Sequence, residues 1–234
     1  MTTNYLTSNP IILKEARNYI DGLMLGDGNI QCMNSKTGYY QHGCKYKNWL
    51  DKIDDNLYEY GIECKVNNGR LQAGGFGIKR DLILYRLWTR SYIEFKEMHD
   101  RWYRKDYNTD EYSTTRWHLD KKTGEYYIWK KIVPKDICLS PVCLANEYFG
   151  DGGTYKRKYV SNYRMILATN GFLREDTIFL AELLSDTLDI NCGVNKSGVI
   201  QVSTQADIST FLSYIKDCGI PDCYTYKFPE ELIK

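Results

Sequence analysis

The sequence predicts an α+β protein made of two similar halves, each with the order helix, two strands, helix, two strands, helix. One segment recurs, as GIECKVNNGRLQ at 61–72 and as DINCGVNKSGVIQ at 189–201. An apolar segment ending in Gly-Asp-Gly precedes each copy, 37 residues from Asp27 to Cys64 and 41 from Asp151 to Cys192. Because recurrence in a fixed order indicates duplication, we assign one half to residues 1–134 and the other to 135–234.

The first helix of each half has a start signal and a stop signal. Asn9-Pro10 and Ser140-Pro141 each place an N-cap residue before a proline at the first helical position. Apolar residues with helical spacing follow, and Gly-Asp-Gly ends both segments. These signals predict helices that end near residues 28 and 152.

The remaining elements follow from alternating and periodic patterns. Polar, aromatic and β-branched stretches between turn residues predict strands at 29–33, 39–46, 159–169 and 199–204. Amphipathic patterns predict helices at about 48–60, 91–103, 174–187 and 207–217. The first half also has an insertion at about 104–130, in which RWHLDKKTGEYYIW is typical of a hairpin around a Lys-Thr-Gly turn.

Composition excludes several classes of protein. The 234 residues are 43% apolar and 26% charged, with a mean hydropathy of -0.51, which is typical of a globular chain. No apolar run approaches the roughly 18 residues of a membrane span, and residues 1–10 lack a targeting pattern, so we expect a soluble protein with no membrane partner. Eight cysteines without a C-x-x-C pair predict reduced, packed thiols and no zinc site.

Charge is segregated along the chain although its net value is only +1. The four segments 28–50, 66–90, 152–174 and 191–204 contain 14 Lys or Arg and a single acid, Asp81. The rest of the chain contains 17 basic and 29 acidic residues. This separation predicts a basic face for a polyanion.

Asp27 and Asp151 stand at predicted helix ends, where the chemistry favours a hard metal ion. A helix C-terminus exposes carbonyl oxygens with partial negative charge, and a carboxylate beside them completes an oxygen-only environment that suits Mg²⁺. Gly26 and Gly150 are expected to let the two helices approach closely, so that the acids meet. Two such ends in a protein with a basic face predict a metal site for phosphodiester cleavage.

The two segments IDGLMLGDG (20–28) and LANEYFGDG (144–152) resemble the signature helices of the LAGLIDADG homing endonucleases with two motifs in one chain. KIVP at 131–134 and YKFP at 226–229 resemble the lysine and proline that close each half of such enzymes. LATNGF at 167–172 and the INCGV strand resemble intron-encoded yeast-type members. The resemblance covers the chain except about 104–130. Asp21, Asn146 and Glu147 depart from an interface that is usually small or apolar.

The resemblance implies two pseudo-symmetric αββαββα repeats that form a saddle of antiparallel sheets over double-stranded DNA. It also implies a monomer that cleaves both strands of a long asymmetric target, leaves 3′ overhangs, and uses Mg²⁺ or, in its place, Mn²⁺. The implied active-site residues are the metal ligands Asp27 and Asp151, the carbonyls of Gly26 and Gly150, and the basic residues Lys131 and Lys227. The lysines alternatively contact phosphate or solvent only.

Strand residues are the candidates for DNA contact, because a two-stranded ribbon fits the major groove and reads bases with Arg, Lys, Asn and Gln. Some of these residues are expected to contact phosphates and fix register. The candidates are Asn29, Gln31, Gln41, Lys45, Lys47, Arg70, Gln72, Lys156, Lys158, Arg164, Asn170 and Gln201.

Two other functions stay open: an RNA maturase with the same fold that binds its host intron RNA, and a DNA-binding module without catalysis. A nucleotide-binding enzyme is disfavoured, because neither Gly-rich loop follows a strand and opens a helix. The abundance of tyrosine and asparagine is typical of an AT-rich genome, and with the resemblance it favours an organellar location, in a mitochondrion or plastid.

Overall fold

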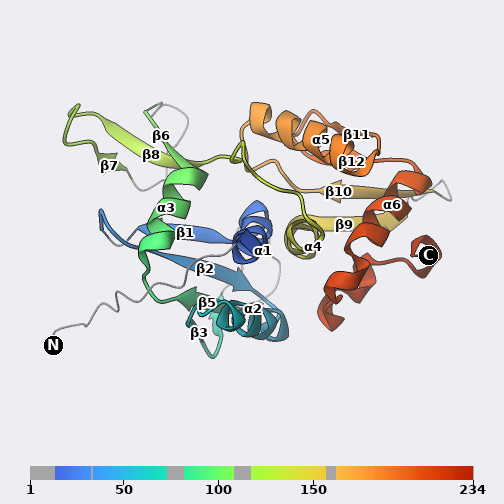
Figure 1. The fold of residues 1–234 in the computed structure, drawn as a ribbon, viewed down its shortest axis with the longest axis horizontal. Coiled ribbons are helices and arrows are strands. Elements are labelled where there is room, and N and C mark those ends of the chain that lie inside the picture. The colour runs from blue at the N-terminus through green and yellow to red at the C-terminus, as the bar shows by residue number, and fades with distance from the viewer. Residues whose placement is uncertain (1–13, 33, 73–81, 108–116, 157–161, 234) are drawn as a thin grey trace.

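The computed structural model describes residues 14–32, 34–72, 82–107, 117–156 and 162–233, and the elements lie as Figure 1 shows. The first half contains α1 (Lys14–Leu25), β1 (Asn29–Cys32), β2 (Gly38–Cys44), α2 (Lys47–Glu59), β3 (Cys64–Val66), β4 (Arg70–Gln72), β5 (Leu82–Thr89) and α3 (Ile93–Trp102). The second half contains α4 (Pro141–Asp151), β9 (Gly152–Lys156), β10 (Tyr163–Leu167), α5 (Arg174–Leu188), β11 (Cys192–Val194), β12 (Ile200–Val202) and α6 (Gln205–Ile215). Three short 3₁₀ turns follow at Lys216–Cys218, Asp222–Lys227 and Glu230–Leu232.

The two main sheets have the same antiparallel strand order. The first sheet runs β1-β2-β5-β3, and the second runs β9-β10-β12-β11. This equivalence confirms the predicted α+β class and the repeated αββαββα order. The predicted helices at 48–60, 91–103, 174–187 and 207–217 end within about two residues of α2, α3, α5 and α6.

The first sheet differs from the second at its outer edge, where the partner of β5 is broken in two. β3 pairs with the end of β5 and β4 with its beginning. Between them Gly69 has φ +79, and Asn67 Oδ1 accepts hydrogen bonds from the amides of Gly69 (3.2 Å) and Arg86 (2.8 Å). The asparagine side chain thus turns the chain while it keeps both pieces on β5.

The insertion adds a third, smaller sheet of β6 (Tyr103–Asp106), β8 (Tyr126–Lys131) and β7 (His118–Leu119), in the order β6-β8-β7. The hairpin predicted around Lys122-Thr123-Gly124 is confirmed, with Gly124 at φ +76. Asp120 holds this sheet together by accepting hydrogen bonds from Lys105 Nζ (2.5 Å) and Tyr107 Oη (2.7 Å). β8 ends at Lys131, so the insertion leads directly into one predicted active-site residue.

Helices α1 and α4 pack side by side at the centre of the molecule (Figure 1). Among the glycines at this interface the tightest is Gly22, where a Cβ would lie 2.2 Å from the carbonyl oxygen of Cys143. A Cβ at Gly26 would lie 3.6 Å from Gly150 Cα, which is an ordinary contact. Gly26 and Gly150 thus lie against each other, in line with the expectation, and a second and tighter contact at Gly22 lies one turn earlier.

Start signals explain where α4 begins. Ser140 caps α4 by accepting a hydrogen bond from the amide of Cys143 (3.3 Å), with Pro141 at the first turn, as predicted. The corresponding signal at Asn9-Pro10 lies outside the described residues.

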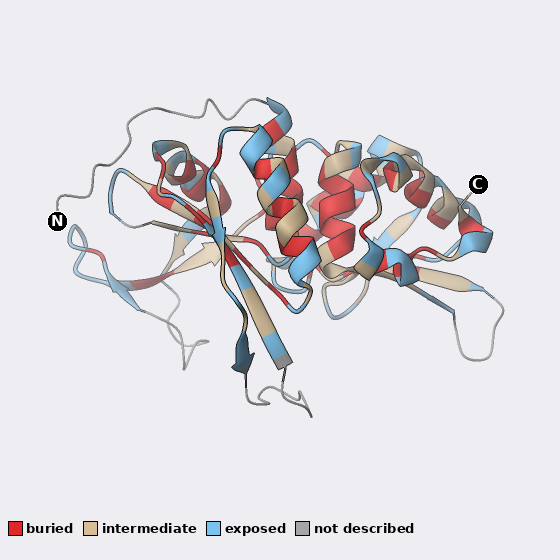
Figure 2. Cartoon of the chain, turned by 90° about the horizontal axis from the view of Figure 1, so that it is seen from below, coloured by how far each residue is buried: buried red, intermediate tan, exposed pale blue. Residues whose placement is uncertain are grey.

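Buried residues concentrate in the central helices and on the helix-covered faces of the sheets (Figure 2). In β2, buried Tyr40, His42 and Cys44 alternate with half-buried Tyr39, Gln41 and Gly43. In β12, buried Ile200 and Val202 likewise flank half-buried Gln201, so each of the two main sheets has one face packed on helices and one face that is open. All eight cysteines are free thiols, as predicted. Within the described ranges, no helix has the length and apolar character required to cross a bilayer.

Candidate active site and nucleic-acid interface

The C-terminal ends of α1 and α4 meet at the two Gly-Asp pairs. A Cβ at Gly150 would lie 3.5 Å from both Gly26 Cα and the amide nitrogen of Asp27. Asp27 is exposed and Asp151 half-buried. The structure thus brings the two predicted carboxylates together at the ends of adjacent helices.

The glycines that follow these acids are required for the turn. A Cβ at Gly28 would lie 2.5 Å from the carbonyl oxygen of Leu23, and one at Gly152 would lie 2.3 Å from the ring of Tyr148. In each half, the chain therefore passes from the motif helix directly into the first strand of the sheet, β1 or β9. This connection places Asp27 and Asp151 between the helix interface and the open faces of the sheets.

Both predicted lysines reach the carbonyls of the motif helix in their own half. Lys131 Nζ donates to the carbonyls of Gly26 (3.2 Å) and Gly28 (2.9 Å). Lys227 is buried, and its Nζ donates to the carbonyls of Tyr148 (3.0 Å), Phe149 (2.7 Å) and Gly150 (3.3 Å). A lysine ammonium at a helix C-terminus offsets the partial negative charge of these carbonyls.

Burial shifts the pKa of all four charged groups toward the neutral form. It raises the pKa of Asp151 to about 6, with a further contribution from Asp27, while the two lysines oppose the shift. Asp27 is exposed on one side, but the protein around its carboxyl group still displaces water, and this desolvation raises its pKa as well. It lowers the pKa of Lys131 and of Lys227 to about 8, against the attraction of the two aspartates. Charges held at this cost in one place are typical of a functional site.

The oxygen donors at this site fit Mg²⁺. Asp27 and Asp151 supply two carboxylates, and no third His, Cys, Asp or Glu joins them into a metal-binding group among the described residues. Mg²⁺ typically binds one or two carboxylates and fills its other positions with water and substrate phosphate. The carbonyls of Gly26 and Gly150 already accept lysine hydrogen bonds, so each has one lone pair left for a metal.

A groove of about 1080 Å³ lies over the open face of the first sheet and extends to Asp27. Strand register aligns one row across four strands, because Asn29 pairs with Gln41, Gln41 with Trp88, and Trp88 with Lys65. Arg70 and Arg86 also line the groove. The groove therefore joins a basic, amide-rich surface to the aspartate pair.

Part of this surface is predicted from the sequence. The predicted contact residues Asn29, Gln41 and Arg70 line the groove, and predicted Gln31 accepts a hydrogen bond from Tyr39 Oη (2.8 Å). The groove residues Tyr39, Lys65, Arg86 and Trp88 are not among the predicted contacts. The alternation in LILYRLWT at 82–89 is the signal that identifies β5 and, with it, Arg86 and Trp88.

The open face of the second sheet is less charged. Its corresponding row consists of Gly153, Ile166, Gln201 and Gly193. Arg164 pairs with exposed Tyr155 on this same face. By contrast, Lys156 pairs with Tyr163 and its ammonium lies 5.5 Å from the Tyr163 ring centre, so strand alternation places it on the side of buried Met165.

The other predicted contact residues lie off the strands or outside the description. Lys47 begins α2 and pairs with Asp51 (2.6 Å), and Lys45 lies in the turn before that helix, its ammonium 4.8 Å from the Tyr46 ring centre. Asn170 lies in an exposed turn after β10. Gln72 ends β4, but its side chain is not described, and Lys158 lies outside the described residues.

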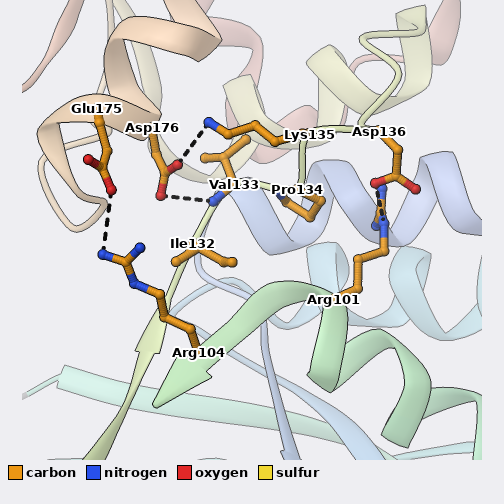
Figure 3. A pocket seen from close by; sticks show the side chains of 9 residues that line it. All are labelled: Arg101, Arg104, Ile132, Val133, Pro134, Lys135, Asp136, Glu175 and Asp176. Carbon is orange, nitrogen blue, oxygen red and sulfur yellow. Dashed lines mark hydrogen bonds and ion pairs between the residues drawn. The ribbon is translucent and has the colours of Figure 1, made fainter. Parts of the chain in front are cut away.

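A second cavity of about 470 Å³ lies beside the segment that joins the halves (Figure 3). Its charged side chains pair with one another: Arg101 with Asp136 (2.7 Å), Arg104 with Glu175 (3.4 Å) and Lys135 with Asp176 (3.2 Å). Asp176 also accepts from the amide of Val133 (3.3 Å). The pairs of Asp136 and Lys135 attach the segment between β8 and α4, the linking segment, to α3 and α5, and the pair of Arg104 joins β6 to α5.

Asn146 and Glu147, two of the residues that depart from the usual motif, lie in the interface between α1 and α4 or in the core beside it. Asn146 Nδ2 donates to the carbonyl of Tyr19 (3.0 Å) across the helix interface. Glu147 is 1% exposed, and its Oε2 has no hydrogen-bond partner among the described residues. Burial raises the pKa of Glu147 to about 8, with a smaller contribution from Asp151.

The chain is similar in sequence to one known protein family and to two known proteins. The sequence model of the LAGLIDADG DNA endonuclease family matches residues 17–206. Identity is 26% over 184 residues to the uncharacterized protein MJ1098 of Methanocaldococcus jannaschii, covering 79% of this chain and 60% of that protein. It is 26% over 208 residues to cytochrome b mRNA maturase bI2 of Debaryomyces hansenii, covering 85% of this chain and 66% of that protein.

Among solved structures, the fold is similar to that of the homing endonuclease I-WcaI bound to its DNA recognition sequence. The TM-score is 0.65 at 19% identity, covering 91% of this chain and 84% of that one. This likeness supports the fold. The chain spans 60% and 66% of the lengths of the two sequence relatives, so their whole activities do not transfer directly.

Proposed function

The chain belongs to the LAGLIDADG DNA endonuclease family, and from this premise we propose that it is a site-specific homing endonuclease. The proposed reaction is hydrolysis of both strands of a long, asymmetric double-stranded DNA target, leaving 3′ overhangs. The observation that carries the proposal is the pair Asp27 and Asp151 at adjoining helix ends, next to the groove of the first sheet.

The proposed site uses Mg²⁺, with Mn²⁺ as a substitute, held by Asp27, Asp151 and the remaining carbonyl lone pairs of Gly26 and Gly150. When bound, such an ion stabilises charge on the scissile phosphate and lowers the pKa of a bound water. Lys131 and Lys227 neutralise the carbonyl-rich helix ends and keep positive charge near the phosphates. Their ammonium groups are already occupied by carbonyls, so we assign them a positioning and electrostatic role.

The proposed oligomeric state is a monomer. One chain already supplies both motif helices and both open sheet faces. The rows Asn29-Gln41-Trp88-Lys65 and Gly153-Ile166-Gln201-Gly193 differ at every position. Such faces require no palindromic target.

Cleavage of a duplex library with a randomised central segment, with and without Mg²⁺, tests the proposal. We expect metal-dependent double-strand breaks at enriched sequences. Asp27→Asn and Asp151→Asn should each abolish double-strand cleavage while DNA binding persists. Double-strand cleavage by the double variant at the wild-type rate contradicts the active-site assignment.

The alternative function is an RNA maturase. It is favoured by the likeness to cytochrome b mRNA maturase bI2 of Debaryomyces hansenii. If the reading frame lies within an intron, a splicing assay with the RNA of that intron separates the two functions. Splicing stimulation that survives Asp27→Asn and Asp151→Asn, without cleavage by the wild type, supports the maturase over the nuclease.

A further inference from the structure

Trp88 is a large apolar side chain in the middle of a polar row on the open face of the first sheet. Its register partners are Gln41 on β2 and Lys65 on β3, with Asn29 one strand further. The side chain is 38% exposed and lines the groove that reaches Asp27. Strand alternation directs it away from buried Leu87 and Thr89, so it does not belong to the core.

The charge of this open face indicates which kind of molecule it binds. Arg70, Arg86 and Lys65 line the groove around Trp88 and complement a polyanion. A two-stranded ribbon of this kind enters the major groove of B-DNA, where side chains meet base edges. Trp88 then faces base edges, since its neighbours in the row are the residue types that read bases.

Base edges in the major groove are hydrogen-bonding groups, with one apolar exception. Only thymine presents a methyl group there, at C5. A half-exposed indole gains hydrophobic contact by covering this methyl, whereas a purine N7, a carbonyl oxygen or an amino group offers it no such gain. We propose that Trp88 is a specificity-determining residue that contacts a thymine methyl in the half-site bound by the first sheet. This inference rests on the proposed DNA-binding function.

The second half provides a matched comparison. Gln41 and Trp88 form the central pair of the first row, and Ile166 and Gln201 form the central pair of the second. Gln201 therefore occupies the position equivalent to Trp88. Trp88→Gln substitutes the side chain that the same fold uses at the equivalent position, and Trp88→Phe keeps an apolar ring.

The test begins with selection of bound duplexes from a randomised library, without divalent metal, by the wild type and both variants. We expect the wild type to enrich thymine at one position of one half-site. Trp88→Gln should lose that preference and keep the rest of the consensus, and Trp88→Phe should retain it in part. Melting temperatures of the variants confirm that they are folded.

The decisive measurement replaces that thymine with deoxyuridine, which removes only the methyl. Wild-type affinity should fall roughly four-fold, the equivalent of one buried methyl group, and Trp88→Gln should bind the two duplexes equally. The contact is disproved if the wild type binds the deoxyuridine duplex as tightly as the thymidine duplex. It is also disproved if all three proteins lose the same affinity on the replacement. If the wild type enriches no sequence at all, the proposed endonuclease function fails instead.

Discussion

Arg101 of α3 and Asp21 of α1 form a two-bond ion pair on the buried side of α1. Arg101 Nη1 donates to Asp21 Oδ1 at 2.6 Å and Nη2 to Oδ2 at 3.0 Å, while Trp102 Nε1 donates to Oδ1 at 2.9 Å. Asp21 is fully buried. Arg101 also reaches Asp136, so one guanidinium joins the first motif helix, α3 and the linking segment.

Arg101→Met should destabilise the protein strongly, because it leaves the Asp21 carboxylate buried with a single remaining donor. The expected loss is about 3–5 kcal/mol, measured by denaturant unfolding. Arg104→Met is the control, since its exposed pair with Glu175 contributes less than about 1 kcal/mol. Asp21→Ala combined with Arg101→Met should recover most of the loss, since Ala145 occupies the equivalent position of α4. Equal effects of Arg101→Met and Arg104→Met contradict this assignment.

Gly22→Ala should disrupt the helix interface, whereas Gly26→Ala should not. A Cβ at residue 22 would overlap the Cys143 carbonyl, and that neighbour is rigid backbone. The expected cost at Gly22 is about 3 kcal/mol or more, against less than about 1 kcal/mol at Gly26. Thermal unfolding measures both. If Gly26→Ala is as destabilising as Gly22→Ala, the tightest contact between the helices is at the Gly-Asp pairs and not at Gly22.

The duplication predicted most of the fold because its signals are local. Helix caps, Gly-Asp-Gly ends and the repeated Ile-x-Cys-x-Val-Asn segment are each read within a few residues. The close approach at Gly22 was not predictable, since it depends on the partner Cys143 in the other half. Likewise, the row that unites Asn29, Gln41, Trp88 and Lys65 exists only through strand register.

The placement of surface lysines shows the same limit. Lys45, Lys47 and Lys156 belong to basic segments of the sequence. A shift of one residue along a strand moves a side chain to the other face of the sheet, as at Lys156. Lys45 and Lys47 lie in the turn and at the start of α2, so they are not strand residues. Lys131 and Lys227 were identified by their position before a proline. Their use of carbonyl oxygens as partners became visible only in three dimensions.

Glu147 should make the protein less stable as pH rises from about 4.5 to about 8. Burial raises the pKa of its carboxyl to about 8, so over this range the folded protein holds a proton that the unfolded chain releases. Glu147→Gln should therefore be more stable than the wild type at pH 8.5, on the order of 3 kcal/mol, and similar to it near pH 4.5. Glu147→Leu copies the equivalent Leu23 and should show the same loss of pH dependence. Unfolding curves at the two pH values decide, and an unchanged pH dependence in both variants refutes the assignment.

Salt dependence tests whether Arg70 and Arg86 contact DNA phosphates. Both line the groove of the first sheet on its open face. Each phosphate neutralised by a basic side chain contributes roughly −0.9 to the slope of log affinity against log salt. Arg70→Gln and Arg86→Gln should therefore each weaken binding and reduce the slope by about 1, because one counterion fewer is released. Lys14→Gln is the control, since Lys14 is exposed at the opposite end of α1 from Asp27 and should leave the slope unchanged.

Binding is measured by fluorescence anisotropy with a selected duplex at several salt concentrations. An arginine variant that weakens binding to one sequence only, with the wild-type slope, is a base contact and not a phosphate contact. A slope reduced equally by Lys14→Gln places the DNA elsewhere on the molecule.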